Sequence, residues 1–122
     1  MNNTSALRIA AVLGFAAVAL GAFGAHGLKE LLARNNTAAI WEKAVLYHFI
    51  HAIMLFILAT RQPLQSGPWF CFLLGIVLFS GSLYLLAFTN VRWLGAVTPL
   101  GGVSFLVGWL WLAICVYPKS TT

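Results

Sequence analysis

Charge is what this sequence has least of. Only 7% of its 122 residues are Asp, Glu, Lys or Arg, and 61% are hydrophobic, whereas about 25% of a typical soluble domain is charged. Four long segments contain no charged residue at all, namely 9–28, 44–60, 62–91 and 93–118. Each can cross a bilayer, which takes roughly 17–25 apolar residues. A water-soluble fold of this length could not bury so much apolar surface, so the sequence predicts an integral membrane protein.

Acidic residues and cysteines are also scarce. The only two acidic residues, Glu30 and Glu42, lie outside the uncharged segments. No span therefore carries a carboxylate for proton-driven transport or for orienting a catalytic histidine. Cys71 and Cys115 lie within apolar segments, without the CxxC or Cys/His spacing of a zinc site. We expect no catalytic residues, no metal and no cofactor, and the chain is predicted not to be an enzyme.

The net charge of +5 does not indicate nucleic-acid binding. The basic residues are scattered at the ends of the apolar segments and form no basic stripe or motif. At those positions they are expected to meet lipid headgroups, and anionic lipid contributes about 1 kcal/mol per basic residue near its surface. The expected partners are membrane lipids, with other membrane subunits or further copies of the chain as open alternatives.

The predicted fold is an all-α bundle of four transmembrane helices, one integral membrane domain over residues 1–122. Gly27, the loop around Pro63 and Pro68, and the pair Thr98–Pro99 separate the helices. Residues 28–36 are expected to form a short amphipathic turn on the membrane surface, and Thr37 and Thr98 are the expected N-caps of the helices after them. The predicted spans are about 6–26, 44–60, 69–89 and 98–117. Four spans put both termini on the same side of the membrane, and the basic residues divide too evenly to choose that side.

Small residues at helical spacing predict where the helices touch, because glycine lets two backbones approach closely in lipid. The predicted packing glycines are Gly14, Gly21, Gly75, Gly101 and Gly108. Tryptophans favour the two membrane surfaces, so Trp41 and Trp93 are expected at one surface and Trp69 at the other. Trp109 and Trp111 are expected deeper.

The histidines are the ionisable side chains expected at membrane depth. Span 1 ends on the side where span 2 begins, so His26, His48 and His51 fall in the same half of the membrane. Span 2 is expected to turn a bulky face to lipid and its histidine face into the bundle. The predicted polar cluster is His26, Tyr47, His48, His51, Ser82 and Thr98.

Three interpretations of this cluster stay open. The first is a hydrogen-bond network that holds helices together in a non-enzymatic accessory or scaffold protein. The second is transport of protons or a small solute, since imidazole can relay protons near neutral pH. The third is a metal or haem site, in which His48 and His51 would share a ligand with His26.

Several strings resemble one known family. They are LGAFGAH at 20–26, YHxxHA at 47–52, FSGSLY at 79–84, and TPLGGVSF at 98–105 followed by Gly108 and Trp109. Together they resemble the YgdD/YwdK-like family of small multi-pass membrane proteins, a domain of unknown function, over nearly the whole chain. The resemblance implies a multi-pass protein of about this length with no assigned activity, and we expect a bacterial inner-membrane location.

Overall fold

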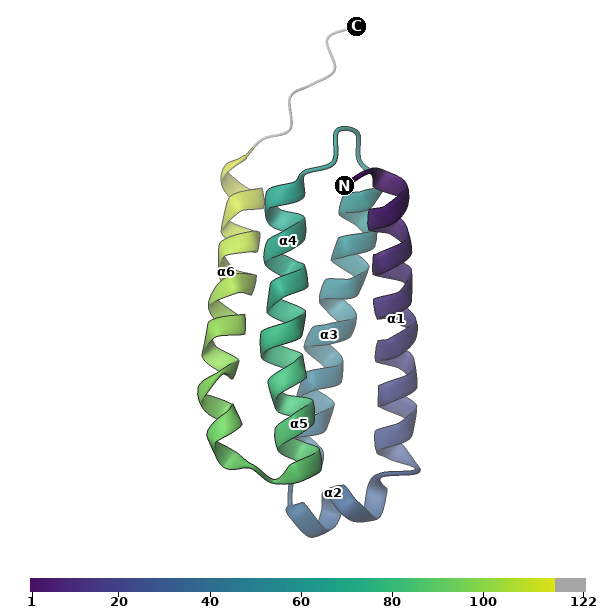
Figure 1. Cartoon of the computed structure of the whole chain (residues 1–122), viewed down its shortest axis with the longest axis vertical. Coiled ribbons are helices and arrows are strands. Elements are labelled where there is room, and N and C mark those ends of the chain that lie inside the picture. Colours follow the sequence, from purple (N-terminus) through teal and green to yellow (C-terminus); the bar gives the residue numbers. More distant parts are fainter. Residues whose placement is uncertain (116–122) are drawn as a thin grey trace, which may run out of the picture.

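The computed structural model describes residues 1–115, and within them the chain is mostly helical and contains no strand (Figure 1). The elements are α1 (Asn3–Ala25), α2 (Lys29–Asn35), α3 (Ala38–Ala59), α4 (Ser66–Gly75), a π-helical segment (Ile76–Ser80), α5 (Gly81–Thr89), a 3₁₀ turn (Arg92–Ala96) and α6 (Thr98–Ile114).

Within residues 1–115, four helical stretches are long and apolar enough to span a membrane, which confirms the predicted fold. They are Asn3–Ala25, Ala38–Ala59, Ser66–Thr89 and Arg92–Ile114. The first turn of α1 and the last turn of α6 lie at the same end of the molecule (Figure 1). Residues 116–117 of the predicted fourth span lie outside the described residues.

The spans form an open row. α1 packs along α3, α3 packs along the third span formed by α4, the π-helical segment and α5, and that span packs along α6 (Figure 1). The inner spans bury 39% and 44% of the residues in their most apolar stretch, and α1 and α6 bury 17% each. The two inner spans therefore form the core of the bundle. The two outer spans pack against the inner ones at the two edges of the row.

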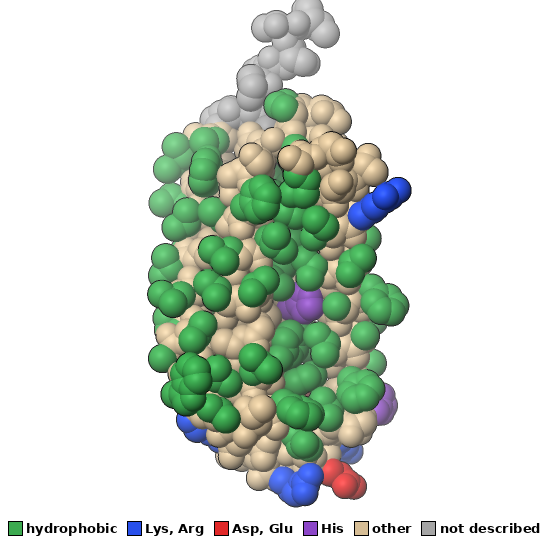
Figure 2. Space-filling model, viewed as in Figure 1, with side chains coloured by type: hydrophobic (Ala, Val, Ile, Leu, Met, Phe, Trp, Pro, Cys, Tyr) green, Lys and Arg blue, Asp and Glu red, His purple; other side chains and the backbone are tan. Residues whose placement is uncertain are grey.

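The faces of α3 follow the sequence pattern. Its bulky side chains are exposed as predicted: Leu46, Phe49, Ile50, Ile53, Phe56 and Ile57. Apolar side chains are also spread along the whole length of the face seen in Figure 2, and the Lys, Arg, Asp and Glu side chains visible there lie mainly at the α2 end. This apolar surface suits contact with lipid tails.

The α2 helix lies across one end of the row and is fastened to the end of α5. Thr37 precedes α3 as expected, but its hydroxyl does not cap that helix; it donates to the carbonyl of Ala87 at 2.8 Å. The amide of Asn35 donates to the same carbonyl at 3.1 Å. The last carbonyls of a helix lack helical partners, so these bonds satisfy the end of α5. The second N-cap also differs, because α6 begins at Thr98 and Val97 precedes it.

The tryptophans differ in burial. Trp69 lies in the first turn of α4, at the start of the third span, and is fully buried there; its indole N–H donates to the carbonyl of Leu55 at 3.2 Å. Trp41 is also buried, with its N–H donating to Leu20 at 2.9 Å. Trp93 is 69% exposed, and Trp109 and Trp111 are each more than one-third exposed. The depth of these rings in the membrane stays a prediction.

Most of the predicted packing glycines lie where helices approach. A Cβ on Gly101 would overlap the backbone nitrogen of Phe79, one on Gly75 would overlap the ring of Phe105, and one on Gly108 would lie 2.6 Å from the ring of Phe72. A Cβ on Gly21 would lie 3.2 Å from Val45. Gly14 is the exception, because nothing lies within 4 Å of its Cβ position; α1 buries one stripe against α3, and Gly14 sits beside that stripe.

The close approach of α6 depends on the π-helical segment. The N–H of Gly81 bonds to the carbonyl five residues earlier, on Ile76, which is the π-helical pattern. This turn brings the backbone of Phe79 against Gly101. It also places Ser80 where its hydroxyl donates to the carbonyl of Ala44 on α3 at 2.8 Å.

We expect Gly101→Ala to destabilise the fold by about 2 kcal/mol, because the new methyl group meets backbone that cannot rotate away. The adjacent Gly102→Ala is the matched control, since its Cβ would meet the Phe79 ring at an ordinary 3.8 Å. Thermal unfolding of the purified protein in detergent measures both. Equal melting temperatures for the two variants would contradict this close packing.

Candidate functional site

Two histidines of α3 are buried in the row of helices. His48 is 3% exposed and His51 is 4% exposed. They lie one turn apart but serve different neighbours: Nδ1 of His48 lies 2.8 Å from the hydroxyl of Tyr84 on α5, while His51 bonds to Trp109 on α6. The two imidazoles therefore link α3 to two other helices and do not converge on one point.

The hydrogen bonds of His51 fix its tautomer. Its Nδ1 lies 2.7 Å from the carbonyl of Tyr47, which can only accept, so Nδ1 carries the proton. Its Nε2 then accepts from the indole N–H of Trp109 at 3.0 Å. The ring also stacks on Phe105, with centroids 3.7 Å apart and planes at 13°. Both nitrogens are used, and no lone pair is left for a metal.

His48 is less completely satisfied. Its Nε2 is buried and closes no hydrogen bond of ordinary geometry within residues 1–115, although the backbone of Leu13 on α1 lies beside the ring. The Tyr84 hydroxyl can donate to Nδ1 or accept from it. If it donates, the remaining N–H of His48 points toward α1. This nitrogen is the one buried imidazole atom in the described chain without a hydrogen bond of ordinary geometry.

Serine and threonine hydroxyls make further links between spans. Ser82 lies 2.6 Å from the hydroxyl of Thr98 and joins the third span to α6. Ser104 donates to the carbonyl of Cys71 at 2.6 Å and joins the same two spans further along. Each of these hydroxyls is engaged by another helix.

The structure separates two residues from the predicted cluster. His26 is exposed at the end of α1, where its backbone N–H closes the last helical turn. It lies toward the end of the bundle as expected, but the helix ends before it can turn into the interior. Tyr47 is 38% exposed and packs its ring against Phe79, with centroids 4.6 Å apart. Its side chain lies at the outer surface of the row.

These positions bear on the three interpretations of the cluster. Because His26 lies apart, the three-imidazole site is not assembled, and within residues 1–115 no three His, Cys, Asp or Glu side chains gather as metal ligands. The structure adds Ser80 and Trp109 to the buried polar set. Ser80 depends on the π-helical turn, which no sequence pattern indicates. Trp109 lies four residues after Phe105, and this spacing places both on the face toward His51.

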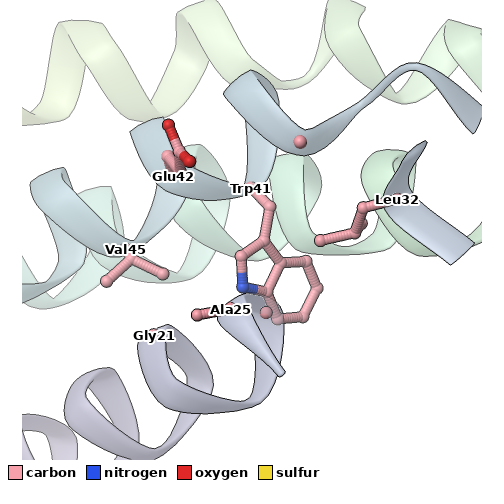
Figure 3. A pocket seen from close by; sticks show the side chains of 8 residues that line it. Gly21, Ala25, Leu32, Trp41, Glu42 and Val45 are labelled. Atoms are coloured by element: carbon pink, nitrogen blue, oxygen red, sulfur yellow. The ribbon is translucent and has the colours of Figure 1, made fainter. Parts of the chain in front are cut away.

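A cavity of about 220 Å³ lies at the α2 end, between α1, α2 and α3 (Figure 3). Gly21, Gly24 and Ala25 make room on α1, and the indole of Trp41 forms one wall. The indole N–H is already bonded to α1, and the Glu42 carboxylate points away from Trp41 and Ala25 in this view. The cavity can hold an apolar group.

We expect His51 and Trp109 to be coupled energetically. Trp109→Phe keeps an aromatic ring and leaves Nε2 of His51 unpaired, while His51→Leu removes both polar atoms. A double-mutant cycle should give a coupling of about 1 kcal/mol, since hydrogen bonds between membrane helices average about 0.6 and reach about 1.7 kcal/mol. Unfolding in mixed detergent measures it. Trp93→Phe is the control, because Trp93 is 69% exposed; a coupling of zero would contradict the pairing.

The chain is similar to a family of bacterial membrane proteins. A family model described as "Protein of unknown function (DUF423)" matches residues 20–102. A UPF0382 membrane protein of Staphylococcus epidermidis is 48% identical over 103 residues, 80% of this chain and 83% of its own. UPF0382 membrane protein YwdK of Bacillus subtilis is 42% identical over 113 residues, 87% and 90% of the two chains. UPF0382 inner membrane protein YgdD of Escherichia coli is 43% identical over 114 residues, 89% and 86%. No solved structure matches.

Proposed function

The chain belongs to the DUF423 family, and on that premise we propose that it is a non-catalytic membrane protein whose helices serve as an accessory or scaffold element. It is a multi-pass integral membrane protein, and residues 1–115 contain four helices long and apolar enough to cross a membrane. The name of the E. coli relative, an inner membrane protein, supports a location in the bacterial cell membrane.

The observation that carries this proposal is how the buried polar groups are used. Both nitrogens of His51 are bonded within the protein, and the hydroxyls of Ser80 and Ser104 bond to carbonyls of neighbouring helices. General acid–base or nucleophilic catalysis needs such a group within reach of a substrate. In this chain the imidazole and hydroxyl groups that could serve in catalysis instead hold helices together.

Exposed apolar faces support the partner side of the proposal. α1 and α6 lie at the two edges of the row, and their outer faces carry large side chains such as Phe15, 76% exposed, and Leu110, 61% exposed. In the membrane such a face meets lipid or another helix. We propose that at least one of these two edge faces contacts another membrane subunit or a second copy of the chain.

Transport is the weaker alternative. The buried polar atoms are bonded in separate groups, such as His48 with Tyr84 and Ser82 with Thr98, and within residues 1–115 no hydrogen bond joins these two pairs. Proton movement across a membrane uses connected relays. Proton flux can be measured in proteoliposomes that contain the purified protein. A flux that is present in the unchanged protein and abolished by His48→Gln would favour transport over a scaffold role.

A photo-activatable residue replacing Phe15 or Leu110 tests the scaffold role in native membranes. We expect a discrete protein adduct from at least one of these positions, because an edge face that binds a subunit holds it within reach. Phe72, which is fully buried, is the control position and should give no adduct with another chain. Lipid adducts alone at both edge positions would contradict the proposal.

A further inference from the structure

A groove of about 390 Å³ runs between α3 and α6. The rings of Phe79 and Phe105 line it, and the α6 residues along it extend from Pro99 to Trp109. That stretch is about 15 Å long at 1.5 Å per residue, roughly half the hydrocarbon thickness of a bilayer. The groove therefore matches the depth of one leaflet. The π-helical turn contributes Phe79 to it, and such turns are frequent at functional sites.

One polar atom at this groove is unused. Tyr47 lines the groove, and its hydroxyl makes no hydrogen bond to any residue within 1–115. A hydroxyl placed in an apolar medium without a partner is costly. Side chains on a helix lean toward its N-terminus, so the Tyr47 phenol leans toward the α2 end, where the spans meet the headgroup region.

A basic residue lies one turn further toward that end. Lys43 precedes Tyr47 by four residues in α3, so both lie on the same face of the helix. Lys43 is exposed and is the last charged residue before the uncharged stretch 44–60. Along one helix face the order is therefore an ammonium group, a phenol hydroxyl and then an apolar groove.

We propose that this groove binds one phospholipid from the leaflet on the α2 side. One acyl chain lies along the groove, an ester carbonyl accepts a hydrogen bond from Tyr47, and the phosphate meets Lys43. The order of the three contacts along α3 is the order of phosphate, ester and chain in a phospholipid. A packed helix from another protein would fill the groove but would not use a cation and a hydroxyl in this sequence.

The inference is separate from the scaffold role, because a lipid site can exist with or without a protein partner. Titration of the purified full-length protein in detergent with phosphatidylglycerol, read by native mass spectrometry, measures its binding. The same titration with diacylglycerol removes the phosphate. A dialkyl-ether phosphatidylglycerol removes the ester carbonyls.

Each variant has its own expected pattern. Tyr47→Phe should weaken binding of the ester lipid about fivefold, the worth of one hydrogen bond, and leave ether-lipid binding almost unchanged. Lys43→Gln should weaken phosphatidylglycerol binding and leave diacylglycerol binding as it is. Gly102→Leu should abolish binding of all three, since Gly102 lines the groove.

Matched controls separate this site from general lipid contact. Gly14→Leu makes the same change where nothing lies within 4 Å, and Lys29→Gln removes an exposed cation from α2; both should bind as the unchanged protein does. Tyr47→Phe should also keep its melting temperature, because no bond within the described chain is lost. Equal losses in Gly102→Leu and Gly14→Leu, or equal effects of Tyr47→Phe on ester and ether lipids, would overturn the proposal. So would a second copy of the chain cross-linked in the groove.

Discussion

Within the bilayer core there is no water to satisfy a polar group, and this constraint governs how the chain uses its few polar side chains. In a soluble protein a serine or histidine at such a position could turn to solvent. Here Ser80, Ser104 and His51 each reach a partner on another helix. Thr37 and Asn35 do the same at the end of α5. The polar residues therefore determine which helices are neighbours, and the apolar residues fill the space between them.

Close approach between helices comes from pairing glycine with an aromatic ring or a backbone segment. Gly75 faces Phe105, Gly108 faces Phe72, and two glycines that the sequence pattern did not single out, Gly24 and Gly67, face Trp41 and Trp111. Lipid tails are as apolar as leucine, so burial alone gives little advantage to helix contact. Van der Waals contact between a flat ring and a glycine backbone supplies the favourable packing energy that burial does not. This explains why large rings lie where two helices meet.

The four spans, the lipid-facing side of α3 and the surface helix were predictable, because charge and hydropathy report depth in the membrane directly. The direction in which a given side chain points around its helix axis was less predictable. His26 was placed at the correct level but sits after the last turn of α1, so its side chain stays outside. Trp69 lies at the start of its span, but the sequence did not indicate that its ring would turn inward and donate to the Leu55 carbonyl. The π-helical turn, and with it the position of Ser80, has no signature in the spacing of residues 76–81, so neither could be predicted.

The open row of helices has a consequence for how the chain is made. Each span packs mainly on the span before or after it in the sequence, so the contacts are local and the loop-closure entropy of each step is small. α1 and α3 can pair as soon as α3 has left the ribosome, before the second half of the chain exists. The later pair then docks on α3, mainly through the third span and also through the contacts of Phe105 and Trp109 with His51. The order of synthesis is thus the order of assembly for most of the packing, and the buried face of α3 is completed last, when α6 supplies the partner of His51.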